Sequence, residues 1–394
     1  GSCVLIPCRF ETPSDFEKYL PRTTVQWRSE KDDTVMFDSK SQSKSLLQGT
    51  FTGDLQRKDC TTLLENLPKR AHDKYHLRLE EPIKWSYKET FLELNVTDSP
   101  PKPKLTPEKV EVMEGTSVSL SCSAAAPCPK LPPNLTWTPK LSDSVDQLQE
   151  DKDKTKSVSS VLTFTASHLH HRQKITCRAL YTLQQGGNQK TSEARLTLKV
   201  RYPPKNTSVS VSPSGSVLEG SSVTLTCSSK ASPPVQNYTW YRVNWTEMNT
   251  VRTGQNLTFN VTESSGSEQY YCEAQNKHGK DNSTTVQLNV IYMPQISGSG
   301  SCSRTAAEIS CSCESRGNPS PSMEWRVSGL RVTNSTDRVI REEQLGNTGL
   351  RSSLTMRHSQ GDTATLLCLS TNVLGTSSLQ LCVPSPQQHS DFSI

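Results

Sequence analysis

The stretch Ser222-Val-Thr-Leu-Thr-Cys227, with Tyr238-Thr-Trp240-Tyr241 and Tyr270-Tyr-Cys272 after it, decides the fold of this 394-residue chain. Apolar and polar residues alternate toward the first cysteine, which is typical of a strand with one buried face. The tryptophan lies in a further short strand between the two cysteines. A disulfide between two such strands, with an indole packed on it, holds two sheets face to face in a β-sandwich.

The same order of cysteine, tryptophan and cysteine recurs in two other quarters of the chain. The sets are Val118-Ser-Leu-Ser-Cys122, Leu135-Thr-Trp137 and Cys177 in the second quarter, and Cys313, Trp325 and Cys368 in the fourth. A repeated unit of this kind is the pattern of tandem immunoglobulin-like domains. We therefore predict an all-β chain with a disulfide across each of these three sandwiches.

Length and composition support a string of small domains. The chain has 394 residues, more than one hydrophobic core usually serves, so units of about 100 residues predict four domains. Strand-forming Val, Thr, Ser and Leu are interrupted by Pro, Gly and Asn, and the mean hydropathy is -0.60. The net charge of +5 comes from interspersed charges rather than a basic stripe, so nucleic acid is not an expected partner.

Proline-rich joints predict where the domains meet. They read Asp98-Ser-Pro-Pro-Lys-Pro, Arg201-Tyr-Pro-Pro and Tyr292-Met-Pro. Proline cannot donate to a sheet ladder, so such segments are expected to end one sandwich and start the next. The predicted domains are residues 1–98, 99–201, 202–292 and 293–383, followed by a tail toward the membrane at 384–394.

Cysteines and glycosylation signals predict an extracellular protein. Thirteen cysteines, few of them in zinc-type pairs, are best explained by an oxidising compartment. Asn-X-Ser/Thr sequons occur at Asn95, Asn134, Asn206, Asn237, Asn244, Asn256, Asn260, Asn282 and Asn334. No run of about 18 apolar residues and no leading signal segment occurs, and we expect both to lie outside these residues.

The first quarter departs from the repeat. Cys8 and Trp27 take their usual places, but the later strand reads Asp73-Lys-Tyr75-His-Leu77-Arg78, with leucine where the second cysteine belongs. Cys60 is then the economical partner for Cys8, within one sheet. Cys3 and Cys128 are left over, and a bridge between them would clamp the first two domains together.

The last domain has more cysteines than one sandwich needs. Cys311 and Cys313 alternate on one strand and face opposite sides. We expect Cys313 to bridge Cys368, and Cys302 to bridge Cys311. Cys382 remains unpaired, either as an intermolecular thiol or as a by-product of where the chain is cut.

Several motifs together resemble one family, the Siglecs, or sialic acid-binding immunoglobulin-like lectins. They are Gly1-Ser-Cys3-Val-Leu-Ile-Pro-Cys8-Arg-Phe, the displaced Cys60, Tyr75-His-Leu77-Arg78, Ile83-Lys84-Trp85-Ser86-Tyr87 and Ser121-Cys122-Ser-Ala-Ala-Ala-Pro-Cys128. The likeness covers the whole chain. It implies one V-set domain followed by three of C2 or I type, as in a myeloid-type or myelin-associated-glycoprotein-like ectodomain.

The resemblance also implies a sialic acid site on the first domain. The family's central arginine corresponds to Arg78, whose two parallel N–H donors match a carboxylate as lysine cannot. Trp85 resembles the aromatic residue that packs on the glycerol chain of the sugar, and backbone groups of Lys84 and Ser86 are expected to bind its polar groups, with Tyr87 assisting. A second family aromatic lies on a strand that precedes Gly1.

Two segments near this site raise further expectations. Leu79-Glu80-Glu81-Pro82 carries two carboxylates that could repel an anionic ligand, so their direction matters. In the family, the choice of glycosidic linkage depends on a loop that corresponds to about Ser39 to Gly49. Three polar side chains of this loop are candidates to reach the underlying sugars: Lys40, Lys44 and Gln48.

The implied function is a cell-surface lectin that binds sialylated glycans, in cis or trans, for cell adhesion and immune-cell regulation. A single-pass type I membrane receptor on the outer side of the plasma membrane is expected. The alternative is an adhesion receptor that binds a protein partner, in which Arg78 is an ordinary strand arginine paired with Glu80 or Glu93.

No enzymatic chemistry is predicted. The sequence has no glycine-rich phosphate loop, no Gly-X-Ser-X-Gly elbow and no paired carboxylates in a cleft-forming context. His168, His170 and His171 could suggest a metal, but a solvated loop between strands is the better interpretation because carboxylates and thiols do not converge there. We expect no cofactor and no metal.

Overall fold

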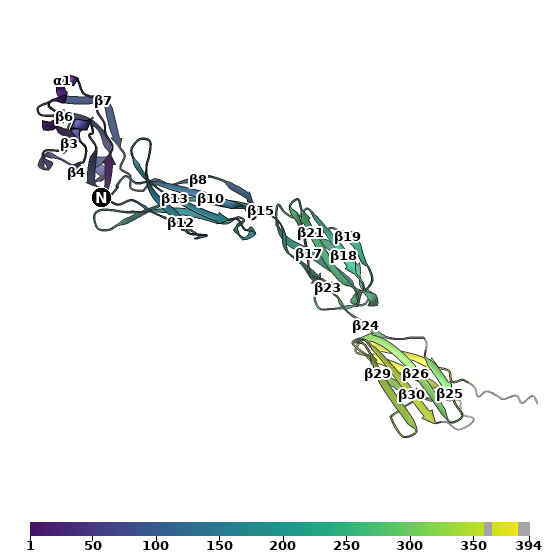
Figure 1. Ribbon diagram of the computed structural model, residues 1–394. Coiled ribbons are helices and arrows are strands. Elements are labelled where there is room, and N and C mark those ends of the chain that lie inside the picture. The colour runs from purple at the N-terminus through teal and green to yellow at the C-terminus, as the bar shows by residue number, and fades with distance from the viewer. Residues whose placement is uncertain (299, 358–364, 385–394) are drawn as a thin grey trace, which may run out of the picture. The chain divides into compact units, whose positions relative to one another are not determined.

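The computed structural model describes residues 1–298, 300–357 and 365–384, and its ribbon is shown in Figure 1. The chain divides into two compact units, residues 1–202 and 203–394. Each unit contains two immunoglobulin-like β-sandwiches with separate hydrophobic cores. The predicted tail lies outside the described residues beyond Pro384. In the part of the chain that is described, no helix is long and apolar enough to cross a membrane.

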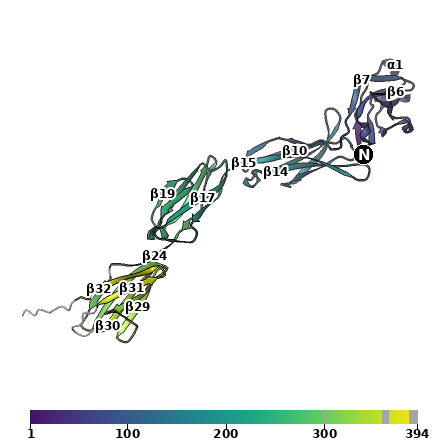
Figure 2. The same cartoon turned by 180° about the vertical axis from the view of Figure 1, so that it is seen from behind.

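The first sandwich packs a three-stranded sheet on a four-stranded one. The first sheet has the order β1 (Ser2–Ile6), β5 (Thr62–Leu67), β4 (Gln48–Phe51), and the second β3 (Val35–Asp38), β2 (Thr24–Ser29), β6 (Asp73–Glu80), β7 (Trp85–Leu94). Short helical turns connect the strands: α1 (Ser14–Glu17), η1 (Leu20–Arg22), η2 (Gln42–Lys44), η3 (Leu55–Arg57) and η4 (Lys69–Ala71). In both views α1 lies beside β7 (Figures 1 and 2).

The second sandwich follows the same plan. One sheet has the order β12 (Ser144–Glu150), β13 (Lys156–Thr165), β10 (Ser117–Ala125), β8 (Lys104–Thr106). The other pairs β11 (Asn134–Thr138) with β14 (Lys174–Thr182) and β14 with β15 (Gln189–Ser212), and β9 (Val110–Met113) runs parallel to β15. The 3-10 turn η5 (His168–His170) lies between β13 and β14.

The third sandwich belongs to the second unit. Beyond Tyr202, β15 pairs with β17 (Ser222–Ser232), which pairs with β20 (Asn256–Asn260). The facing sheet has the order β19 (Met248–Thr253), β18 (Asn237–Val243), β21 (Gln269–Asn276), β22 (Gly279–Asn282), with β23 (Val286–Gln287) also on β21. The 3-10 turn η6 (Glu263–Gly266) precedes β21, and β16 (Ser216–Leu218) runs parallel to β24 (Asn289–Ile296).

The fourth sandwich completes the described chain. One sheet joins β24, β26 (Glu308–Asn318), β30 (Gly349–Arg357) and β29 (Arg338–Leu345), with β25 (Ser301–Arg304) on β26. The other has the order β28 (Leu330–Arg331), β27 (Ser322–Val327), β31 (Leu366–Asn372), β32 (Gly375–Leu381).

Two joints differ from the expectation that proline ends a strand. Pro203 and Pro204 lie inside β15, and Pro294 lies inside β24. In β24 the partner strand changes here, from β16 through Ile291 to β26 from Tyr292 onward. A missing N–H costs little where a strand exchanges one partner for the next, because the ladder is interrupted there in any case.

A buried tryptophan stands opposite the same strand position in all four domains. The cross-strand pairs are Trp27 with Leu77, Trp137 with Cys177, Trp240 with Cys272, and Trp325 with Cys368. In the last three domains the cysteine of this pair crosses to the other sheet. The first domain has only the packing of a leucine at this point, as the sequence of β6 indicates.

The structure forms six disulfides, in the pairs that the sequence favours. They are Cys3–Cys128, Cys8–Cys60, Cys122–Cys177, Cys227–Cys272, Cys302–Cys311 and Cys313–Cys368. The Cα atoms of Cys8 and Cys60 are 4.8 Å apart, on neighbouring segments of one sheet. Those of Cys227 and Cys272 are 6.2 Å apart, across two sheets. Cys382 is free and exposed.

Candidate functional site

Arg78 lies on the outer face of β6, because its neighbours Leu77 and Leu79 both point into the core. Strand alternation therefore turns the guanidinium away from the sandwich. Ser86 of β7 is its cross-strand partner on one side and Gln26 of β2 on the other. The side chain is 24% exposed, so most of it is packed against its neighbours.

Hydrogen bonds fix the orientation of the Arg78 guanidinium. Nε donates to Oε2 of Glu80 over 2.6 Å, and Nη1 donates to Oγ of Ser86 over 3.4 Å. Nη2 makes no hydrogen bond to a described residue. With the Nε edge occupied by Glu80, a carboxylate can approach only through the end that carries Nη1 and Nη2.

The glutamates at the end of β6 and directly after it are both engaged by cations. Glu80 contacts Arg78 itself, and Glu81 pairs with Nζ of Lys40 over 2.9 Å. The hydrogen bond from Lys40 lowers the pKa of Glu81 below its ordinary value, and the charges of Lys84 and Lys44 act in the same direction. The repulsion expected of these glutamates is therefore offset locally by basic side chains.

Trp85 is the first residue of β7 and forms part of the sheet edge. It stands opposite the buried Leu79 rather than opposite Arg78, and 41% of the residue is exposed. Its ring meets that of Phe16 of α1 edge to face, with centroids 5.8 Å apart. A ligand that contacts Arg78 and Trp85 together must therefore lie across the edge of β7, where outward-facing backbone groups have no strand partner.

A bulge shapes this edge. Arg78 pairs with Ser86, but His76 pairs with Phe91, so four residues of β7, numbers 87 to 90, face the single residue Leu77. Extra residues on one strand bend it and re-aim its side chains. The sequence of β7 does not indicate this bulge, because the strand contains no glycine or proline.

Tyr87 is committed to the structure of the first domain. Its hydroxyl donates to the carbonyl of Glu11 over 2.5 Å, and its ring lies 6.2 Å from that of Phe10. Burial, the larger cause, raises the pKa of Tyr87. Tyr87 was expected to assist ligand binding, and its hydroxyl already has a backbone partner.

A polar network beside Arg78 was not predicted from the sequence. Gln26 donates to Asp38 over 2.9 Å and accepts from Arg28, whose Nη1 donates to Asp33. The ring nitrogens of the buried His76 lie 2.9 Å from Glu30 and 3.3 Å from Asp33. The sequence pattern that could have predicted this network is the presence of polar residues at alternate positions of two adjacent strands. The network links β2, β3 and β6, the strands beside Arg78.

The loop expected to reach underlying sugars is partly engaged. Lys40 is paired with Glu81, as described, and Gln48 accepts a hydrogen bond from Asn66 over 3.3 Å. Lys44 ends the 3-10 turn η2 and is exposed. The ion pair of Lys40 links this loop to the segment that follows Arg78.

The remaining predicted residues lie apart from this edge. All nine sequon asparagines are exposed, as glycosylation requires. His168 contacts Glu114 over 2.8 Å, and ring nitrogens of His170 and His171 accept from backbone N–H groups. Within residues 1–298, 300–357 and 365–384, no group of three or more His, Cys, Asp and Glu side chains could hold a metal ion.

Comparisons with known proteins place these domains. Residues 204–290 match the family described as an immunoglobulin domain, and residues 101–187 match the CD80-like C2-set immunoglobulin domain. The solved ectodomain of mouse nectin-like molecule 4 is 22% identical and covers 74% of this chain and 94% of its own, with a TM-score of 0.39. That likeness is too low to add to the sequence comparison.

Two kinds of relative match most of the chain. Myelin-associated glycoprotein of Rattus norvegicus is 30% identical over 338 residues, 82% of this chain and 51% of the relative. Sialic acid-binding Ig-like lectin 5 of Homo sapiens is 28% identical over 356 residues, 83% of this chain and 61% of the relative. The chain thus spans little more than half the length of these relatives. It belongs to the immunoglobulin-domain family of myelin-associated glycoprotein and the sialic acid-binding Ig-like lectins.

Proposed function

We propose that this protein is a cell-surface lectin whose first domain binds sialylated glycans, with Arg78 pairing with the sialic acid carboxylate. The observation that carries the proposal is the state of the guanidinium. It stands on an outer sheet face beside an edge strand, and its end with Nη1 and Nη2 hydrogen-bonds, among the described residues, only to the neutral hydroxyl of Ser86. Two of its relatives are named sialic acid-binding Ig-like lectins, and these names support the same ligand.

The edge of β7 supplies the other contacts in this proposal. The carboxylate meets Nη1 and Nη2 of Arg78, the glycerol chain of the sugar packs on Trp85, and backbone groups of Lys84 and Ser86 bind its polar substituents. Tyr87 positions β7 through its bond to Glu11 and makes no direct contact. The indole is held by Phe16, so little side-chain freedom is lost on binding.

The magnitude of these contacts implies weak binding at a single site. A charge-assisted hydrogen-bond pair contributes roughly 1.5–3 kcal/mol net, and an exposed aromatic contact adds about 1 kcal/mol. Clustered receptors that face dense glycans multiply such contacts through effective concentration. Cell adhesion and immune-cell regulation at the outer side of the plasma membrane, in a single-pass type I protein, are the roles we propose.

The test compares Arg78→Ala and Arg78→Lys with the unchanged chain, displayed multivalently on beads that meet cells with intact or sialidase-treated surfaces. The proposal expects bead binding that depends on sialic acid, is lost in Arg78→Ala and is not restored by lysine. An unchanged melting temperature serves as the control for folding. Binding that survives both the substitution and the sialidase would instead support a receptor for a protein partner.

A further inference from the structure

The third domain displays an aromatic patch on the outer face of the sheet β19-β18-β21-β22. Tyr241 of β18 and Tyr271 of β21 are cross-strand partners whose rings stack with centroids 5.0 Å apart at an interplanar angle of 15°. Tyr271 donates to Sδ of Met248 over 3.0 Å. Met248 is 62% exposed, and Trp245, in the turn between β18 and β19, is 94% exposed. An exposed apolar surface of this kind usually marks a binding site.

Three sequon asparagines border this same face. Asn237 of β18 is paired with Gln275, which alternation places on the side of Tyr271, and Asn244 lies in the turn that follows β18. Asn282 of β22 is the cross-strand partner of Glu273, the residue two positions beyond Tyr271. Asn282 and Tyr271 are therefore diagonal neighbours, with backbones roughly 7–8 Å apart.

The two faces of the Tyr271 ring are turned toward different neighbouring strands. Tyr241 covers the ring face turned toward β18. The opposite ring face is turned away from β18, and β22 with Asn282 lies on that side of β21. The first sugar on Asn282 is tethered within reach of this ring face, so its apolar C–H surface can be buried without the entropy cost of free association.

We propose that the Tyr271–Tyr241 stack is the surface on which the chain's own N-linked glycan at Asn282 packs. The first N-acetylglucosamine packs on Tyr271 and covers the aromatic patch. Glycans at Asn237 and Asn244 flank it and keep protein partners away from this face. The occupant is thus carbohydrate from this chain rather than a second copy or another protein.

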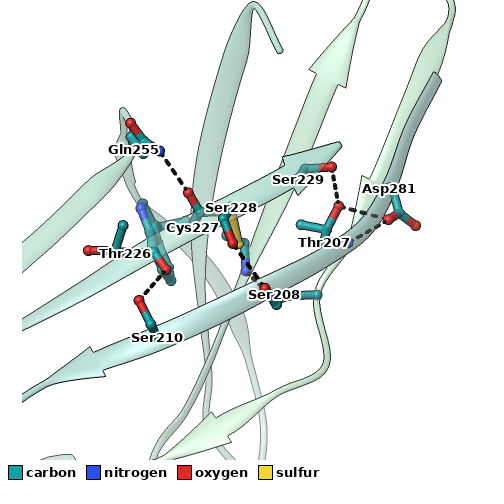
Figure 3. The surroundings of a disulfide bond; sticks show 12 residues. Thr207, Ser208, Ser210, Thr226, Cys227, Ser228, Ser229, Gln255 and Asp281 are labelled. Carbon is teal, nitrogen blue, oxygen red and sulfur yellow. Dashed lines mark hydrogen bonds between the residues drawn. A yellow bond between two sulfur atoms is a disulfide. The ribbon is translucent and has the colours of Figure 1, made fainter. Parts of the chain in front are cut away.

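The opposite sheet of the same domain offers a matched contrast. Asn256 and Asn260 of β20 are opposite Thr226 and Ser222, and the outer face there is lined by hydroxyl groups. Figure 3 shows part of it beside the Cys227 disulfide: Ser208 contacts Ser228 over 3.0 Å, and Ser210 donates to the carbonyl of Thr226. A glycan on Asn260 therefore meets hydroxyl groups and no aromatic ring.

The test uses the full chain secreted from glycosylating cells, with site occupancy read by mass spectrometry. Asn282→Gln is expected to lower the melting temperature of the third domain by about 3 °C. The unfolding of this domain is measured by hydrogen exchange within β21. Asn260→Gln is the matched control and is expected to change it by less than about 1 °C. In a Tyr271→Leu background, Asn282→Gln should have no further effect.

Two more measurements do not depend on how well the variants fold. An endoglycosidase that leaves one N-acetylglucosamine should preserve the stability of the native protein, whereas complete removal should lower it. Proton spectra of the trimmed protein should show sugar resonances shifted upfield by the tyrosine ring. An unoccupied Asn282, equal effects of the two asparagine variants, unshifted sugar resonances, or a dimer formed through this face would each overturn the proposal.

Discussion

Arg78 in the first domain and Arg178 in the second occupy the same position of the sandwich, one residue after the partner of the buried tryptophan. Their surroundings differ. Arg178 has Glu193 directly opposite on β15, and its Nε and Nη2 both donate to that carboxylate, over 3.0 and 2.7 Å. Arg78 has the neutral Ser86 opposite and bonds a glutamate of its own strand through Nε alone.

The residue opposite on the neighbouring strand distinguishes the two arginines. A carboxylate at that position pairs with the guanidinium, whereas a neutral residue does not. Glu193 also accepts from Arg195, and the two arginines, with Arg195 the larger influence, hold the pKa of Glu193 below its ordinary value. That carboxylate stays charged and keeps Arg178 occupied at every physiological pH. Ser86 carries no charge, so no carboxylate stands directly opposite Arg78 on β7.

The largest expected effect is the loss of one arginine and not the other. Arg78→Ala should reduce binding to sialylated cells by at least tenfold, because a bidentate contact is worth roughly 1.5 kcal/mol or more. Arg178→Ala should leave binding unchanged. Equal losses in the two variants, measured by cell binding of the same multivalent display, would mean that the position matters only for folding.

A smaller effect is expected from making the first arginine resemble the second. Ser86→Glu places a carboxylate opposite Arg78, as Glu193 stands opposite Arg178, and should lower binding about tenfold by competing with the ligand. Ser86→Gln, of similar size and without charge, is the control. A glycan-array measurement in which both variants bind equally would show that the cross-strand charge is not what separates the two arginines.

The role of Glu80 predicts a gain of binding. Glu80→Gln keeps an acceptor for Nε of Arg78 and removes a negative charge beside an anionic ligand, so affinity should rise about threefold. Glu80→Ala removes the acceptor as well and should lower affinity, since the guanidinium is no longer fixed. Surface plasmon resonance on a sialylated surface distinguishes the two, and a loss in both variants would leave Glu80 with a positioning role alone.

The last expected effect concerns stability at the same strand rather than binding. Tyr75 of β6 donates to the carbonyl of Ala71 over 2.6 Å, and Tyr75→Phe should cost the first domain about 1 kcal/mol. Burial raises the pKa of Tyr75 to about 12 from an ordinary value of 10.0. The stabilisation is therefore complete below pH 10 and is lost as the pH rises toward 12.

The measurement for Tyr75 is urea unfolding at pH 7 and pH 11. The unchanged domain should lose more stability between these two values than Tyr75→Phe, which has no hydroxyl to ionise. Tyr270→Phe in the third domain is the comparison, because its hydroxyl contacts Glu268 instead of a backbone carbonyl. An identical alkaline loss in the presence and absence of the Tyr75 hydroxyl would contradict the assignment.

Much of the fold is legible from local patterns. Cysteine and tryptophan spacing indicates three sandwiches, because a disulfide and an indole must meet in each of these cores, and chain length indicates a fourth. Elimination among Cys3, Cys8, Cys60 and Cys128 indicates the displaced bridges. The proline joints were less informative. Strands β15 and β24 run through Pro203 and Pro294, since a strand that changes partners needs no ladder bond at the point of exchange.

The candidate site, like the fold, has some features that the sequence predicts and others that it does not. The residue types of Arg78, Trp85 and Tyr87 are visible in the sequence, but the hydrogen bond from the Tyr87 hydroxyl to Glu11 is not, because Glu11 is distant along the chain. The bulge at residues 87 to 90 and the pairing of Trp85 with Leu79 depend on register. Register is set by the packing of the whole sheet and cannot be inferred from one strand.

The amino-acid sequence was sufficient to define the β-sandwich repeat, the family and the arginine on an outward strand position, because these follow from spacing and alternation. Only the tertiary structure decided which groups surround that arginine. Glu80 holds its Nε, Ser86 stands across from it, and Glu193 closes the otherwise equivalent Arg178. Cross-strand neighbours come from distant parts of the chain, so electrostatic surroundings depend on register and folding rather than on local sequence.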